Sequence, residues 1–204
     1  TFVACIILFH PFGYIISNHG FKKTIHQERN FFGILKVLDD LTDQRFLLNG
    51  TTNHGAQSLR EKYRLMPISY YAPGSGIQEA MDILNKKQGK QKIGVIGLGI
   101  GVLSCFSKEG RNFDFYEINP AVQKIAENPE YFTFLKDCGS PYRIILGDGR
   151  LTLKSQPDHQ YDMVVIDAFS SDNIPIHLLT IEAINLYLQK IKEDGIVIVH
   201  ISNR

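Results

Sequence analysis

Four carboxylate side chains follow short apolar segments in the second half of the chain. Glu117, Asp148 and Asp167 each end an apolar run, and Asp172 closes the segment that begins at Asp167. Such runs are expected to be buried strands, and ligands of open α/β sheets bind beyond the carboxyl ends of the strands. Carboxylates gathered there repel one another unless a cation lies among them. The pattern predicts a site for a positively charged ligand, such as a sulfonium or a polyamine, and disfavours a phosphate.

A glycine-rich turn precedes these carboxylates. The apolar run 92–96 leads into Gly97, Gly99 and Gly101, which form a G-x-G-x-G pattern. Glycines at a strand end let the backbone approach a ligand closely. The nicotinamide pattern needs Gly or Ala where this chain has Val102. The turn therefore favours a binder of an S-adenosyl sulfonium over a binder of NAD or FAD.

The spacing suggests a role for each acid. Glu117 lies 20 residues after the first glycine of the turn, the offset at which an acid reaches ribose hydroxyls. Asp148, next to Gly149, is placed to accept from an exocyclic amine such as that of adenine. Plainer interpretations stay open: a surface glutamate, a turn-forming Asp-Gly, and a helix cap or solvated loop for Asp167 and Asp172.

The elements that must position these residues alternate along the chain. Continuous Val, Ile and Leu runs between helical patterns predict a parallel sheet covered on both faces. Upstream, β-like runs at 31–38 and 45–52 predict a hairpin, and 53–76 is expected to form loops. Strands are then expected at 92–96, 113–117, 143–146, 162–166 and 195–202, and helices at 77–87, 101–108, 120–127 and 178–191.

Composition sets broad limits on the function. The 204 residues are 44% hydrophobic and 21% charged, as in one globular domain with at most a small appendage. Lys and Arg total 22 against 21 Asp and Glu, so no charge excess predicts a nucleic-acid partner. The cysteines Cys5, Cys105 and Cys138 are widely spaced. This spacing predicts reduced thiols and neither a disulfide framework nor a zinc site.

The apolar stretch 2–16 has two interpretations. It is a buried strand or core segment, or it is the end of a membrane-spanning helix, which needs ~20 apolar residues. Lys22 and Lys23 follow it, as expected on a cytoplasmic flank. The chain begins with Thr and stops two residues after its last expected strand. We therefore expect it to be a fragment.

Several longer segments together resemble one family. They are RNFFGILKV, LLNGTTNHGAQ, YYAPGSGI, VIGLGIG, FYEINPAV, LGDGR, DAFSSDNIPIHLLT and HISNR, and they span residues 29–204. The combination resembles the spermidine synthase (polyamine aminopropyltransferase) family, and most closely its bacterial branch fused to an N-terminal transmembrane region.

The resemblance implies an α/β fold in three parts. Residues 77–204 would form a Rossmann-like S-adenosylmethionine-dependent methyltransferase core whose parallel sheet is truncated at its C-terminal end. Residues 26–76 would form a small N-terminal β lobe, and 1–25 would be a transmembrane remnant. The domain would then be cytoplasmic and attached to the inner membrane through helices that precede it.

The resemblance also implies a cofactor site at the strand ends of the core. Glu117 would hold the ribose and Asp148 the adenine. The ligand would be decarboxylated S-adenosylmethionine as co-substrate, or S-adenosylmethionine itself, with no metal. The implied cofactor-binding residues are Gly97, Gly99, Gly101, Glu117, Asp148 and Gly149.

The amine site implied by the resemblance centres on Asp167 as the catalytic base. Asp172 would be a second acid that binds the amine, and Tyr70 or Tyr71 would line the amine channel. The chain departs from the family at two positions. The acid of the family's G-G-G-D-G turn, which holds the aminopropyl end of the donor, is Ile100 here. The family's glutamine after the lobe falls near Asn53, where the chain offers His54 and Gln57 as candidate substrate-binding residues.

The expected activity is aminopropyl transfer from decarboxylated S-adenosylmethionine to a small amine, putrescine or a related polyamine. An amine with a pKa near ~10.4 is neutral in about one molecule in a thousand at pH 7, so a general base such as Asp167 is useful. Two alternatives stay open: an S-adenosylmethionine-dependent methyltransferase, which Ile100 favours, and a non-catalytic module that binds a nucleoside or polyamine. A homodimer and membrane attachment are further open options.

Overall fold

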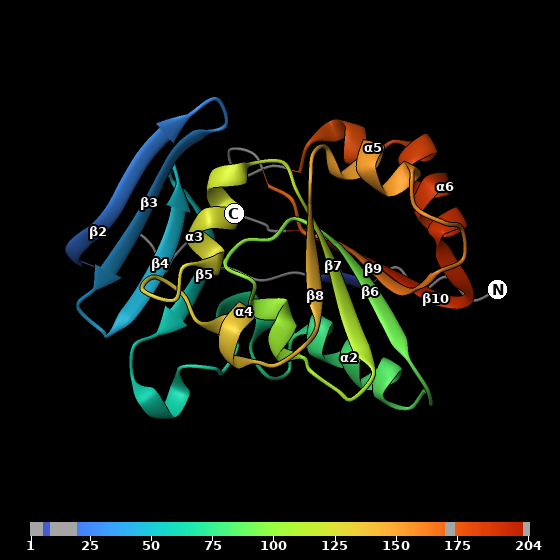
Figure 1. The fold of residues 1–204 in the computed structure, drawn as a ribbon, viewed down its shortest axis with the longest axis horizontal. Helices are drawn as coiled ribbons and strands as arrows, with labels where there is room; N and C mark the ends of the chain where they lie inside the picture. The colour runs from blue at the N-terminus through green and yellow to red at the C-terminus, as the bar shows by residue number, and fades with distance from the viewer. Residues whose placement is uncertain (1–5, 9–19, 170–173, 202–204) are drawn as a thin grey trace.

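A computed structural model of the chain describes residues 6–8, 20–169 and 174–201, and Figure 1 shows two separate sheets. The smaller sheet is antiparallel and four-stranded, in the order β2-β3-β4-β5. The larger sheet has six strands in the order β1-β10-β9-β6-β7-β8, and its neighbouring strands pair in parallel. This is the predicted α/β fold with a small β lobe.

The strand bounds are as follows. The antiparallel sheet consists of β2 (Phe21–Asn30), β3 (Gly33–Asp40), β4 (Gln44–Asn49) and β5 (Thr52–Ser58). The parallel sheet consists of β1 (Ile6–Leu8), β6 (Gln91–Ile96), β7 (Arg111–Glu117), β8 (Tyr142–Leu146), β9 (Tyr161–Ile166) and β10 (Ile191–His200).

Helices cover both faces of the parallel sheet. Val95 of β6 and Met163 of β9 belong to the core cluster under α2 (Gly76–Asn85), α3 (Pro120–Glu127) and α4 (Phe134–Asp137). Ile96 and Val164, which point to the opposite face, belong to the cluster under α5 (Gly149–Lys154) and α6 (Ile181–Lys190). Because both faces are buried, β6, β9 and β10 carry near-continuous apolar runs over 93–96, 163–166 and 196–199.

Helices α2, α3, α5 and α6 begin at side-chain caps. The side chains of Ser75, Asn119, Asp148 and Thr180 accept hydrogen bonds from backbone N–H groups in the first turns of α2, α3, α5 and α6. Such caps satisfy N–H groups that have no partner within the helix. Two of them, Asn119 and Asp148, stand at the carboxyl ends of strands β7 and β8. Helix geometry therefore fixes side chains at the edge where a ligand is expected.

Two predicted segments are wrong. Residues 53–58, predicted as loops because 53–76 is rich in Gly, Pro, Ser and Tyr, belong to strand β5, since pairing with β4 outweighs the weak β propensity of these residues. The helix predicted at 101–108 is a short 3-10 turn, Val102–Cys105, preceded by a left-handed Gly101 with φ 78°. Strand β2, which lies outside the predicted hairpin, pairs with β3 in antiparallel orientation. Two further 3-10 turns, Glu61–Tyr63 and Ser69–Tyr71, connect the sheets, and a last one, Ile176–Leu178, precedes α6.

The prediction of reduced thiols is also wrong for two cysteines. Cys105 and Cys138 form a disulfide with their Cα atoms 4.8 Å apart. They are 33 residues apart in sequence, but the 3-10 turn that ends at Cys105 packs against α4, which ends beside Cys138. The spacing of the two cysteines in the sequence does not predict this contact. The bond links the segment after the glycine turn to the helix beneath it.

The described part of the apolar lead is a strand. Backbone pairing sets Ile6 opposite Ile198 and Leu8 opposite His200, so β1 lies parallel to β10 at the edge of the larger sheet. This matches the strand interpretation for 6–8, while 1–5 and 9–19 lie outside the described residues. Among the helices of the described part, none has the length and apolar composition needed to cross a membrane.

The antiparallel sheet is joined to the core by polar contacts near the strand ends. Each contact links a lobe side chain to the region between β7 and α4. They are Asn30 Nδ2 to Asn119 Oδ1 (2.8 Å), Arg45 Nη1 to the carbonyl oxygen of Glu130 (2.6 Å), and Gln57 Nε2 to Thr133 Oγ1 (2.9 Å).

Candidate functional site

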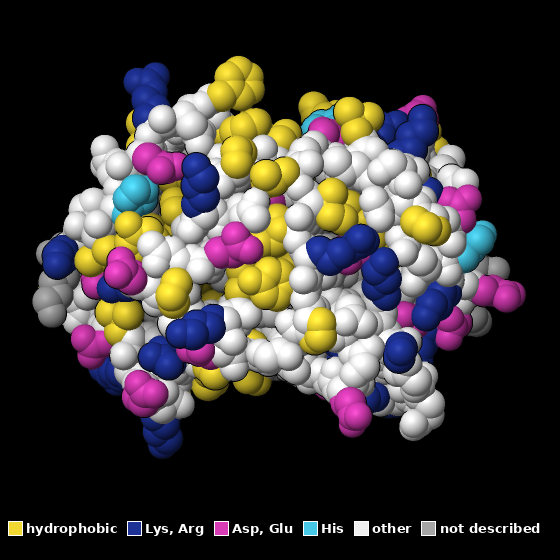
Figure 2. All heavy atoms as spheres, viewed as in Figure 1, with side chains coloured by type: hydrophobic (Ala, Val, Ile, Leu, Met, Phe, Trp, Pro, Cys, Tyr) yellow, Lys and Arg dark blue, Asp and Glu magenta, His cyan; other side chains and the backbone are white. Residues whose placement is uncertain are grey.

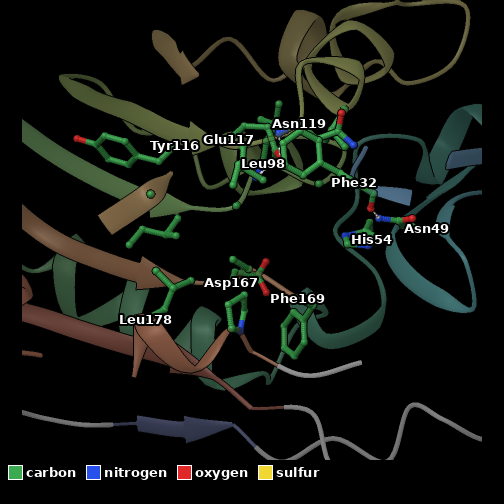
Figure 3. Close-up of a pocket in the computed structure, with 18 of the residues that line it drawn as sticks. Phe32, Asn49, His54, Leu98, Tyr116, Glu117, Asn119, Asp167, Phe169 and Leu178 are labelled. Atoms are coloured by element: carbon green, nitrogen blue, oxygen red, sulfur yellow. Dashed lines mark hydrogen bonds between the residues drawn. The ribbon is translucent and has the colours of Figure 1, made fainter. Parts of the chain in front are cut away.

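A cavity of about 230 Å³ lies at the carboxyl ends of the parallel strands, beneath the antiparallel sheet. Figure 3 shows Phe32, Asn49 and His54 of the lobe on one side of it, with Glu117 and Asp167 at strand ends of the core. The cavity is thus lined by both sheets. This is the location predicted for the strand-end carboxylates.

The glycine turn after β6 is held tightly between neighbours. Gly97 has φ 104°, and a methyl group on it would lie 2.3 Å from the carbonyl oxygen of Asp167. Gly99 has φ 55°, and a methyl group there would lie 2.5 Å from the carbonyl oxygen of His54. Only glycine fits both the conformation and the space. Gly97, Gly99 and Gly149 line the cavity, and Gly101 instead packs against Leu135.

Glu117 is buried at the end of β7, with 7% of its surface exposed. The backbone N–H of Leu98 donates to its Oε2 (3.0 Å) and that of Asn119 to its Oε1 (2.8 Å). Burial raises the pKa of Glu117, and the backbone donors partly oppose that rise. The carboxylate therefore ties together the two strand-end turns that contain Leu98 and Asn119.

Asp148 combines a capping role with a place in the cavity. Its Oδ1 accepts from the backbone N–H of Leu151 (2.9 Å), and its Oδ2 lies 2.9 Å from Nε2 of His177. Asp148 thus caps α5, whereas the plainer interpretation of it was an Asp-Gly turn, and both Asp148 and His177 also line the cavity. The two functions are compatible because each carboxylate oxygen accepts more than one hydrogen bond.

Asp167 stands at the end of β9 and is held from two sides. The hydroxyl of Tyr71 hydrogen-bonds to its Oδ2, and Nδ1 of His200 lies 2.5 Å from its Oδ1. Asp167 lines the cavity. Its orientation is therefore set by a tyrosine from one turn and a histidine from the neighbouring strand.

His54 and Tyr70 face this carboxylate from the lobe side and line the cavity. Burial lowers the pKa of His54, although the charge of Asp167 acts in the opposite direction. Burial raises the pKa of Tyr70 well above its ordinary value, and Asp167 adds to the rise. Both side chains are therefore held in their neutral forms near neutral pH.

Some predicted site residues lie elsewhere. Gln57 is buried away from the cavity lining, where its amide exchanges hydrogen bonds with Thr133 (2.9 and 3.1 Å). Tyr71 reaches the site through Asp167 and does not line the cavity. Asp172 lies outside the described residues.

Ile100 takes no part in the cavity lining. It is fully buried in the core, and a methyl group on Gly55 would lie 2.6 Å from its Cγ1. The position that holds an acid in the family's glycine turn is thus an apolar contact between the turn and β5. No carboxylate replaces that acid at this position.

Three residues of the site were missed by sequence reasoning: Asn119, His177 and His200. His200 ends β10, and the register of β9 and β10 sets the neighbouring Val199 opposite Ile166. That pairing brings His200 beside Asp167, 33 residues earlier in sequence. The segment HISNR contains His200 and was noted for its resemblance to the family, but only the strand pairing shows that Asp167 is the partner of His200.

Two amide groups are fitted to receive a ligand. Within the described chain, Nδ2 of Asn119 and Nδ2 of Asn53 are buried and have no hydrogen-bond partner. Both residues line the cavity. Because a buried donor without an acceptor is costly, a ligand with hydroxyl or ring-nitrogen acceptors is expected here. A nucleoside carries such atoms, so the residues fit the predicted cofactor class.

The charge of the cavity lining is one-sided. Its described lining residues include Glu117, Asp148 and Asp167 but no lysine or arginine. On the face shown in Figure 2, by contrast, basic and acidic side chains are interspersed. No group of three or more His, Cys, Asp and Glu suited to a metal occurs among the described residues.

Comparisons with known proteins agree on the fold. A spermidine synthase from Thermotoga maritima superimposes with a TM-score of 0.61 at 15% identity, covering 88% of this chain and 57% of the synthase. A probable spermidine synthase from Corynebacterium glutamicum gives 0.65 at 13% identity, covering 88% and 62%. At such identities the likeness concerns the fold alone.

Two curated proteins are similar in sequence. A polyamine aminopropyltransferase from Vibrio vulnificus is 32% identical over 113 residues, which cover 53% of this chain and 36% of that protein. An N-terminal histidine N-methyltransferase from Emericella nidulans is 27% identical over 202 residues, covering 91% of this chain and 35% of that protein. The chain thus spans about a third of either relative. No protein-family model matches the chain.

The chain therefore has the Rossmann-like methyltransferase fold of the spermidine synthases, with a small antiparallel lobe, and is similar in sequence to an aminopropyltransferase and to a methyltransferase.

Proposed function

We propose that this protein transfers an aminopropyl group from decarboxylated S-adenosylmethionine to a small amine, putrescine or a related polyamine. One observation carries the proposal: Glu117, Asp148 and Asp167 surround one cavity whose described lining residues include no lysine or arginine. A sulfonium and an amine are both cations, and a cluster of carboxylates attracts both. The fold of the spermidine synthases and the similarity to an aminopropyltransferase support the same activity.

The nucleoside part of the donor would lie along the ends of β6, β7 and β8. Glu117 would accept from ribose hydroxyls, and Asp148 from the amino group of adenine. The free amide N–H groups of Asn119 and Asn53 would donate to acceptor atoms of the donor. Gly97 and Gly99 would leave room for it at the turn.

Asp167 would act on the amine. The sulfonium supplies a carbon that a neutral amine can attack, so the task of the protein is to align the amine and to remove its proton. Asp167 lines the cavity and is held by Tyr71 and His200. The neutral His54 and Tyr70 beside it add no competing cation.

Methyl transfer to an amine is the second candidate. Ile100 favours it, because a buried isoleucine replaces the acid that would hold the ammonium of an aminopropyl tail. The methyltransferase relative aligns with most of this chain. The two reactions share the nucleoside site and the base and differ in the group transferred.

Product analysis separates the candidates. The protein is incubated with either donor and a panel of diamines, and the nucleoside product is identified by chromatography and mass spectrometry. Methylthioadenosine from the decarboxylated donor would support aminopropyl transfer. S-adenosylhomocysteine from S-adenosylmethionine would support methyl transfer instead. Nucleoside binding without either product would contradict both and favour a binding module.

A further inference from the structure

His200 is a buried residue in direct contact with the proposed base. It is 5% exposed, and its Nδ1 lies 2.5 Å from Oδ1 of Asp167. It does not line the cavity. Any influence of His200 on an amine in the cavity must therefore pass through Asp167.

The imidazole ring of His200 is fixed by aromatic neighbours. The Tyr70 ring lies 4.2 Å from it at an angle of 36°, and the Phe169 ring lies 4.9 Å away, edge-on. The hydroxyl of Tyr71 bonds to the other oxygen of Asp167. The ring thus has little freedom to turn, and its Nδ1 is directed at the carboxylate.

A carboxylate needs such support in this position. Asp167 follows β9 and leads into a loop, so its own backbone does not restrain its side chain as a helix would. General-base catalysis depends on an oxygen lone pair within hydrogen-bond reach of the proton that it removes. Two donors on the two oxygens fix the plane of the carboxylate. Histidine does this best when the Nδ1 nitrogen carries the proton and donates it.

We propose that His200 is a positioning residue for Asp167: its Nδ1–H donates to Oδ1 and orients the carboxylate toward the substrate amine. The inference rests on the proposed function. In the reaction, the amine nitrogen bonds to the donor carbon as the carbon–sulfur bond breaks, and the bonding electrons pass to sulfur. The proton of the new ammonium goes to a free lone pair of Asp167, while the His200 proton stays on Nδ1.

Two substitutions separate hydrogen bonding from packing. His200→Asn keeps an N–H donor close to the place of Nδ1 but removes most of the ring. His200→Phe keeps the ring between Tyr70 and Phe169 but removes the donor. If positioning is the role, turnover falls about 10- to 100-fold in His200→Phe, as expected for the loss of one charge-assisted hydrogen bond. Turnover in His200→Asn stays within a few-fold of wild type.

The kinetic pattern excludes a general loss of structure. Methylthioadenosine affinity, measured by calorimetry, is expected to stay unchanged in both variants, because neither change touches Glu117 or Asp148. The decrease in His200→Phe is expected in kcat. If His200→Phe retains wild-type turnover while His200→Asn loses it, the residue serves packing alone and the proposal is overturned.

A measurement without turnover keeps this inference separate from the proposed function. Nuclear magnetic resonance of 15N-labelled protein is expected to show a downfield Nδ1–H proton for His200 that disappears in Asp167→Ala, which removes the acceptor oxygen. If His200 carries its proton only on Nε2, the positioning proposal fails whatever the activity. If the wild type releases no product from either donor, the proposed function fails, and the resonance still decides the hydrogen bond.

Discussion

Asp167 is the residue on which the proposed chemistry depends, and its contacts define a specific experiment. We expect Asp167→Asn to lower turnover by about 10²–10⁴-fold, the usual contribution of a general base. Donor affinity is expected to change little, because Glu117 and Asp148 remain. Steady-state kinetics with separate calorimetry of methylthioadenosine measures both quantities.

A matched control for that variant is Asp43→Asn. Asp43 is an exposed residue of the β3–β4 turn that pairs with Arg60 at 3.3 Å. Its replacement is expected to leave turnover and affinity unchanged. Wild-type turnover in Asp167→Asn would contradict the catalytic role, and loss of donor affinity alone would assign Asp167 to donor binding.

Glu117 is expected to bind the nucleoside. Its carboxylate is buried and already accepts from two backbone N–H groups. Removing a charged hydrogen bond costs roughly 1.5–3 kcal/mol, so Glu117→Gln should weaken methylthioadenosine binding by about tenfold or more. Calorimetry at constant pH gives the dissociation constant, and unchanged affinity would remove Glu117 from the nucleoside site.

Glu117 also predicts a pH dependence of stability. Burial raises its pKa in the folded protein above its ordinary value. Its contribution to stability is therefore complete below the ordinary value near ~4.3 and is lost as the pH rises through the raised value. Compared with Glu117→Gln, the wild type should lose stability between acid and neutral pH.

Denaturant unfolding of the wild type and Glu117→Gln across this pH range shows whether the wild type loses or gains stability relative to the variant as the pH rises. Glu109→Gln, at an exposed position, is the control and should show no such trend. A wild type that gains stability relative to Glu117→Gln as the pH rises would show that the backbone donors outweigh the cost of burial.

At the scale of elements, the glycine turn after β6 packs closely against the end of β9 and against β5 of the lobe. A methyl group on Gly97 would meet the carbonyl oxygen of Asp167 at 2.3 Å and would require φ 104°. We expect Gly97→Ala to shift the end of β6 away from β9 and to weaken nucleoside binding. The substitution should lower the free energy of unfolding by more than the ~1–2 kcal/mol that an alanine in a left-handed conformation costs.

Gly89→Ala separates these two causes. Gly89 also has a positive φ, 87°, but no atom lies within 4 Å of its Cβ position. Gly89→Ala should be destabilised only by the unfavourable backbone conformation and should keep wild-type affinity for methylthioadenosine. Equal losses in both variants would mean that the close approach at Gly97 is unimportant.

At the scale of the whole molecule, the antiparallel sheet must stay docked for the cavity to exist. Gln57 is 2% exposed and contacts Thr133 across the junction in both directions. Gln57→Leu keeps the volume but leaves buried partners unsatisfied, at a cost of about 1–3 kcal/mol. We expect faster hydrogen exchange in β4 and β5 and weaker ligand binding.

The parallel sheet provides the internal reference for this experiment, since β6 and β9 should keep their protection. Gln123→Leu is the matched variant, because Gln123 makes an exposed hydrogen bond to Glu127 within α3. It should change neither exchange nor affinity. If hydrogen exchange in β4 and β5 is slower or unchanged in Gln57→Leu, the docking of the lobe depends on other contacts.

The sequence by itself determined the parallel sheet and the set of strand-end acids. Buried parallel strands contain near-continuous apolar runs, and their carboxyl ends share one edge, so local patterns were sufficient. This reasoning placed Glu117, Asp148 and Asp167 around one cavity together with Gly97 and Gly99. It did not predict that Asp148 caps α5, since the plainer interpretation there was an Asp-Gly turn.

Only the tertiary structure decided the contacts between distant segments. His200 reaches Asp167 through the pairing of β10 with β9, and Cys105 contacts Cys138 because the 3-10 turn that ends at Cys105 packs against α4. Ile100 is buried against β5, a strand whose polar sequence has weak β propensity. Such contacts arise from packing between elements, and residue spacing along the chain does not encode them.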